Sequence, residues 1–185
     1  MRTFLHTFRL LGAVLAAGLI SGQAMAADAT ADTFATVLKP LTLAKTSDLN
    51  FGLLLASTGT VNINPANGNR TGDTGTLSTA NGTAPTRAVF TVGGLANQTY
   101  SISATAATVV LANTVTPANV LTVTLSGVHA LSNNATGTAA TASAGKLDVN
   151  GNDTLGVGGS LLLASSTPTG NYINRAGIAL TVNYN

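Results

Sequence analysis

Few side chains in this 185-residue sequence could act as a nucleophile or a general base. After the apolar N-terminal stretch the only histidine is His129, which follows Ser126, Gly127 and Val128. A catalytic base needs an orienting carboxylate and a nucleophile beside it, but serine and threonine occur throughout this chain, so a nearby one indicates little. A histidine in a surface loop at the end of a strand is the favoured interpretation of His129, and a catalytic base is the alternative.

The carboxylates are also poorly placed for chemistry. All six acidic residues are aspartates, and they are too scattered to nominate a glycosidase pair. The run Asp148–Asp153 is superficially similar to a calcium-binding loop, but its glycine stands fourth rather than sixth, and Gly159 occupies the place of the final glutamate. The chain has no cysteine, which excludes thiol catalysis and cysteine metal ligands. We therefore expect no enzymatic activity, no cofactor and no metal.

Residues 1–26 have the features of a cleaved secretory signal peptide. Arg2 and Arg9 supply positive charge, residues 10–20 form an apolar run, and Ala24-Met25-Ala26 matches a small-residue cleavage site. The apolar run is too short for a membrane-spanning helix, although a retained anchor is the alternative. We expect an exported chain that begins at Ala27 and has no membrane span after cleavage.

Removal of this segment changes the charge balance. The full chain has eight Lys and Arg against six Asp, and two arginines leave with the signal peptide, so six charges of each sign remain. A neutral chain without a basic cluster offers no electrostatic footprint for nucleic acid or anionic membranes. Charged residues make up 8% of the chain, against roughly 25% in typical soluble proteins. Such a surface favours association, because little charge repulsion keeps copies apart.

The remainder of the chain has an all-β composition. Thr, Val and Ile recur between clusters of Gly, Asn and Pro, and eight to eleven short strands favour an immunoglobulin-like or pilin-like antiparallel β-sandwich. Pro40 cannot donate a ladder hydrogen bond, so the first strand is expected at an edge or broken there. The expected inward rows are Ala35, Val37, Leu41 and Leu43; Leu49, Phe51, Leu53 and Leu55; Val61 and Ile63; Ala88, Phe90 and Val92; Tyr100, Ile102 and Ala104; and Leu121, Val123 and Leu125.

A hairpin is expected around the Asn-Gly pair at residues 150–151. A two-residue loop would set Asp148 opposite Asp153 and oppose like charges. A three-residue loop would set Leu147 opposite Leu155. We therefore predict the three-residue loop Asn150-Gly151-Asn152, with Gly or Asn in the left-handed conformation.

The most regular strand pattern lies at the C-terminus. From residue 172 to residue 185, one parity carries mainly apolar and aromatic residues and the other carries mainly polar ones. We predict one long strand that ends in a penultimate tyrosine and finds its partners elsewhere. Its inward row, the candidate assembly strand, is Ala176, Ile178, Leu180, Val182 and Tyr184.

Four segments carry a family pattern, namely Ala35–Gly52, Val61–Pro65, Ala88–Ile102 and Leu180–Tyr184. The most specific parts are the Leu-Asn-Phe-Gly block at residues 49–52 and the Val-Asn-Tyr ending at residues 182–184. On these residues the chain resembles the DUF4402 family of secreted bacterial proteins, whose function is uncharacterised. The resemblance covers nearly the whole sequence after the signal peptide.

The layout is also similar to that of pilin subunits assembled by a chaperone and an usher. That resemblance implies a sandwich lacking one strand, a C-terminal strand that pairs with a periplasmic chaperone, and completion by a neighbour's N-terminal extension. The extension would be residues 27–38, before a sandwich domain at residues 39–185. The pilin cysteine pair is missing, and a complete sandwich is the alternative. The extension's two rows are poor in large apolar residues, being Ala29, Ala31, Thr33, Ala35 and Val37, or Phe34, Thr36 and Leu38.

Two functions fit these features. The first is a non-enzymatic structural subunit of a bacterial surface fibre or coat, which polymerises with copies of itself after passing a periplasmic chaperone and an outer-membrane usher. The second is a monomeric extracellular module that binds polysaccharide or a cell-surface ligand. The second function predicts a groove with exposed tyrosines such as Tyr100 and Tyr172. A secreted hydrolase that uses His129 has almost no support.

Overall fold

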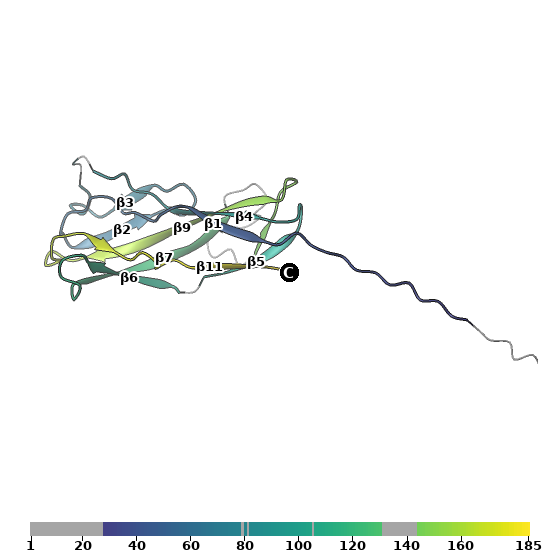
Figure 1. The fold of residues 1–185 in the computed structure, drawn as a ribbon. Coiled ribbons are helices and arrows are strands. Elements are labelled where there is room, and N and C mark those ends of the chain that lie inside the picture. The colour runs from purple at the N-terminus through teal and green to yellow at the C-terminus, as the bar shows by residue number, and fades with distance from the viewer. Residues whose placement is uncertain (1–27, 79, 81, 105, 131–143) are drawn as a thin grey trace, which may run out of the picture. The chain divides into compact units, whose positions relative to one another are not determined.

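Alternating apolar residues form the strands of two antiparallel sheets (Figure 1). The computed structural model describes residues 28–78, 80, 82–104, 106–130 and 144–185, and these residues contain no helix. The strands are β1 (Thr42–Ser47), β2 (Gly59–Ile63), β3 (Arg70–Gly72), β4 (Ala88–Gly93), β5 (Thr99–Ala104), β6 (Thr108–Asn113), β7 (Val120–Ala130), β8 (Ala144–Lys146), β9 (Asn152–Leu163), β10 (Tyr172–Ile173) and β11 (Leu180–Tyr184).

The strands pair in a larger and a smaller sheet. The larger sheet has the order β1-β4-β9-β7-β6-β10, with β2 joined to β9 and β3 joined to β2, and the smaller sheet has the order β11-β5-β8. The predicted all-β antiparallel sandwich is confirmed. The expected effect of Pro40 is confirmed as well, because β1 begins two residues later and is an edge strand paired with β4.

The larger sheet is organised around β9. The first half of β9 pairs with β4 and the second half with β2, while β7 runs along its other side. β7 shifts its register between Leu125 and Val128, opposite a glycine-rich stretch of β9. A Cβ at Gly158 would overlap the carbonyl oxygen of Ile63. The absent side chain therefore lets the end of β2 approach β9.

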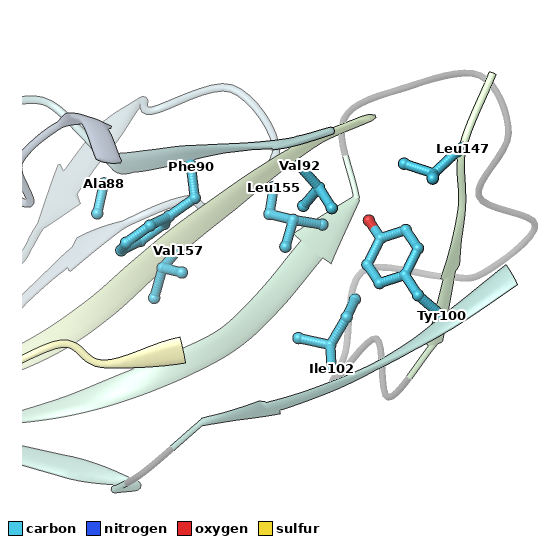
Figure 2. Packing of buried hydrophobic residues seen from close by; sticks show 8 residues of the cluster. All are labelled: Ala88, Phe90, Val92, Tyr100, Ile102, Leu147, Leu155 and Val157. Atoms are coloured by element: carbon cyan, nitrogen blue, oxygen red, sulfur yellow. The ribbon is translucent and has the colours of Figure 1, made fainter. Parts of the chain in front are cut away.

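Buried side chains form two clusters. In the first, Phe90 and Leu155 from the larger sheet lie on the side that faces Tyr100 and Ile102 of β5 (Figure 2). The second cluster lies against the other part of the larger sheet and contains Phe51, Val61, Ile63, Val109, Val123, Leu161 and Leu163. Five of the six predicted rows contribute buried residues to these clusters, although Ala104 at the end of one row is exposed.

The row predicted at Leu49–Leu55 is wrong. Gly52 has a φ of 74°, a left-handed conformation that breaks the strand alternation. Phe51 is consequently buried, whereas Leu53 and Leu55 are 44% and 48% exposed. The segment forms two isolated bridges instead of a strand.

The hairpin predicted at residues 147–155 is also wrong. A three-residue loop with a left-handed glycine does form, but Asp148 pairs with Asn152, so the loop is residues 149–151 instead of the predicted 150–152. β8 pairs with β5 and β9 pairs with β4, so the chain crosses between the sheets instead of returning along itself. The Asp148 carboxylate holds the turn by accepting hydrogen bonds from the N–H groups of Asn150 and Asn152, both at 2.8 Å. Gly151 has a φ of 79°, the left-handed conformation that the turn requires.

The chain divides into two units, residues 1–36 and residues 37–185. In the first unit the structure describes residues 28–36, which are exposed and have no regular secondary structure. The predicted signal peptide lies outside the described residues. Ala35 and Val37, predicted in the first row, lie before β1 and are exposed. Among the described residues, no helix has the length and apolar character needed to span a membrane.

Candidate functional site

The C-terminal segment does not form the single long strand predicted at residues 172–185. Its first part, β10, pairs with β6 in the larger sheet, and its last part, β11, pairs with β5 in the smaller sheet. Ile173 lies opposite Ala112 and Leu180 lies opposite Ala104. From Ile173 to Leu180 the C-terminal segment advances seven residues, while its partner advances eight residues between Ala104 and Ala112. The segment follows the path of one strand, but it is interrupted where its partner passes from one sheet to the other.

Asn174 and Gly177 produce this interruption. The side-chain amide of Asn174 donates to the carbonyl of Val110 at 2.8 Å, and its side-chain oxygen accepts from the N–H of Ala176 at 3.0 Å. Such local bonds compete with a strand ladder. At Gly177 a Cβ would overlap the Val109 side chain, so glycine lets the backbone close on β6.

Three of the five residues predicted for the assembly strand lie on one face of β11. Leu180, Val182 and Tyr184 are half-buried and pack against the first core cluster. Ile178 also packs there, from the turn before the strand. Ala176 is exposed in the interruption, so the prediction that it belongs to the row is wrong. β11 is the edge strand of the smaller sheet. No strand of the described residues pairs with its outer edge, so another strand can add there.

Tyr184 joins the C-terminal strand to the start of the folded unit. Its hydroxyl donates to the carbonyl of Lys39 at 2.7 Å and accepts from the N–H of Leu95 at 2.8 Å. The two partners precede β1 and β5 respectively. One side chain therefore connects the end of β11 to two loops that are distant in sequence.

We expect Tyr184→Phe to lower the free energy of unfolding by about 1–3 kcal/mol, because the variant leaves a main-chain donor and acceptor without this hydroxyl. Denaturant unfolding measures the change. Tyr172→Phe is the matched control, since it removes an exposed hydroxyl that donates only to the carbonyl of Pro168 in the described structure. Equal losses in the two variants would contradict a special role for Tyr184.

A groove of about 650 Å³ opens beside the C-terminal segment. Its two walls are residues 49–56 and residues 167–175. Between the walls, leucine side chains of β6, β7 and β9 line the groove, namely Leu111, Leu121, Leu161 and Leu163. Arg175 is the only charged residue among the described lining residues, and threonine or asparagine residues contribute to both walls. The groove is therefore a channel of mixed polarity with leucines between its walls and a single cation.

A family model described as a domain of unknown function, DUF4402, matches residues 41–184. The chain belongs to the DUF4402 family. No curated protein and no solved structure matches it. The predicted family resemblance is thereby confirmed.

The Leu-Asn-Phe-Gly block of this DUF4402 domain builds one wall of the groove. The Asn50 side chain accepts a hydrogen bond from the N–H of Gly52 at 2.7 Å, and the Asn50 backbone exchanges two 2.8 Å hydrogen bonds with Thr86. Arg70 then donates to the carbonyls of Phe51 and Leu53 at 2.8 and 3.0 Å. The block thus forms a loop whose main-chain carbonyls are held by an arginine on β3.

Sequence reasoning missed both Arg70 and Arg175. A single arginine beside an apolar row does not indicate from sequence that its side chain binds main-chain carbonyls, as Arg70 does, or lines a groove, as Arg175 does. The candidates for chemistry named from the sequence are His129 and the aspartates, and the described structure shows no site that they form together. His129 lies in β7 opposite Gly156, and its side chain is outside the described part of the structure. No group of three or more potential metal ligands occurs among the described residues.

The tyrosines do not form a stacking platform in this DUF4402 domain. Tyr100 is fully buried, and its hydroxyl donates to the Asp153 carboxylate at 2.7 Å. The expectation that Tyr100 is exposed for ligand binding is therefore wrong. Tyr172 is half-buried at the groove and its hydroxyl donates to Pro168.

Proposed function

We propose that this protein is a non-enzymatic structural subunit of a bacterial surface fibre or coat, and that copies assemble by adding an extended segment to the groove. The observation that carries the proposal is the groove with leucines between its walls, beside the outer edge of the C-terminal segment. β10 ends the larger sheet and β11 ends the smaller sheet. An incoming strand can therefore bond to main-chain groups along an edge while its side chains cover the leucines.

The groove favours an extended peptide over a compact ligand. Its walls are two stretches of chain, and leucine side chains lie between them along its length. An added strand presents every second side chain to such a surface. Each large apolar side chain buried there contributes about 1.5–3 kcal/mol.

The N-terminal arm, residues 28–38, has the properties of the incoming segment. It has no regular secondary structure, and Phe34 is 88% exposed. Phe34 and Leu38 share one parity, so a strand conformation would place both on the face that covers the leucines. We propose export through the predicted signal peptide, with a periplasmic chaperone covering the open edge until an outer-membrane usher assembles the subunits.

The test is the assembly state of the chain beginning at Ala27. We expect concentration-dependent polymers by analytical ultracentrifugation, and we expect Phe34→Gln with Leu38→Gln to shift the chain to monomer. The matched control, Thr33→Gln with Val37→Gln, changes the other parity and should keep the polymers. A chain that stays monomeric without any substitution would refute the proposed function.

A further inference from the structure

The arm and the groove have complementary charges. Asp28 and Asp32 are the only charged residues of the arm, which is therefore acidic up to Lys39. The groove's described lining carries the single cation Arg175. Building on the proposed function, we propose that Asp32 of a neighbouring copy pairs with Arg175 and fixes the register in which the arm is added.

This pairing determines the direction of the added strand. Within the wall formed by residues 167–175, Arg175 is the end nearest β11. The even-numbered row of the arm is acidic at Asp32 and apolar at Phe34 and Leu38. The apolar pair reaches the rest of the groove only if the arm runs antiparallel to the C-terminal segment. Thr36 then comes near Asn171, beyond the two residues of β10.

The same direction requires the arm to come from another copy. With Asp32 at Arg175, Leu38 lies at the end of the groove away from β11. The chain's own Lys39 is bonded to Tyr184, at the far end of β11. β11 has five residues and is about 15 Å long, so the groove position of Leu38 and the position of Lys39 are separated by at least that length. Consecutive Cα atoms are only about 3.8 Å apart, so this Leu38 and this Lys39 cannot belong to the same chain. The contact is therefore head-to-tail and extends into an open chain of subunits.

Charge exchange in the chain from Ala27 tests the pairing. Asp32→Lys alone and Arg175→Asp alone should each weaken subunit association about two- to fivefold, the range for a partly exposed ion pair. The combination of the two should restore association. Asp28→Lys is the matched control, because it changes net charge equally but lies outside the pair, and it should weaken association less than Asp32→Lys.

Cysteine cross-linking tests the register independently, since the natural chain has no cysteine. Thr36→Cys with Asn171→Cys should give a ladder of disulfide-linked copies on a non-reducing gel, and Thr36→Cys with Ile173→Cys should give little. Two results would overturn the proposed register but not strand addition itself. One is stronger cross-linking through Thr36→Cys with Ile173→Cys, and the other is an equal loss of association in Asp28→Lys and Asp32→Lys. Absence of polymers in the unsubstituted chain would instead overturn the proposed function.

Discussion

Replacing Tyr100 with phenylalanine should lower the free energy of unfolding by about 2–4 kcal/mol. The Tyr100 hydroxyl donates to the Asp153 carboxylate at 2.7 Å, and both residues are buried, at 0% and 3% exposure. Asp153 also accepts a hydrogen bond from the N–H of Thr154 at 2.6 Å. A hydrogen bond to a charged group contributes about 1.5–3 kcal/mol, and removing one partner of a buried charged group costs more. Equilibrium denaturation with urea measures the change.

A pH series separates this interaction from a simple packing defect. Burial, together with the hydrogen bond to Asp153 and its negative charge, raises the pKa of Tyr100 well above its ordinary range. Above about pH 10 the unfolded chain releases the Tyr100 proton while the folded chain keeps it. This contribution to stability is therefore complete below about pH 10 and is lost as the pH rises, by up to about 1.4 kcal/mol per unit. The stability gap between the natural chain and Tyr100→Phe should narrow above pH 10, and a constant gap would contradict this account.

Gly158→Ala should destabilise the domain by about 3 kcal/mol or more. Its Cβ would overlap the carbonyl oxygen of Ile63 and lie 2.7 Å from the backbone nitrogen of Pro65. Both neighbours are main chain, so neither can move as a side chain would, and overpacked cores cost about 1–3 kcal/mol even where side chains adjust. Thermal unfolding, followed by circular dichroism, measures the loss.

Gly93→Ala is the matched control for this prediction. Its Cβ would meet one atom, the hydroxyl of Thr42 at 2.7 Å, and that exposed side chain can rotate away. We expect a change below about 1 kcal/mol, as for an exposed site. Similar losses in the two variants would show that glycine within any strand matters, rather than the contact between β2 and β9.

The sequence predicts strands well where two conditions hold, namely strict alternation and no local hydrogen-bonding side chain. The row at Ala88, Phe90 and Val92 satisfies both, and all three residues are buried. The row at Leu49–Leu55 has the same alternation but contains Asn50 and Gly52. A left-handed glycine held by an asparagine side chain turns Leu53 and Leu55 away from the core, and alternation alone does not reveal this.

Sheet membership is harder to predict than strand position. A turn with a left-handed Gly151 is correctly predicted, because the Asn-Gly pair has a specific conformational preference, although the loop begins one residue earlier than expected. Whether the chain returns along itself or crosses to the other sheet depends on contacts with β4 and β5, which are distant in sequence. The interruption between β10 and β11 also depends on distant residues, because Asn174 bonds to Val110 and Gly177 lies against Val109, both on β6. The groove, which lies between two walls separated by more than a hundred residues, has no local signature at all.

The hydroxyl of Tyr184 has a mechanical consequence. It closes a loop of 145 residues between Lys39 and Tyr184, and Lys39 is where tension applied to the arm would enter the folded unit. Without that contact, a pulling force would reach β1 first and could peel this edge strand from β4 one hydrogen bond at a time. With it, the load passes at once to β11 and through β5 to the smaller sheet. The bond distributes tension over both layers, so the domain should resist extension more strongly than its edge strand would alone.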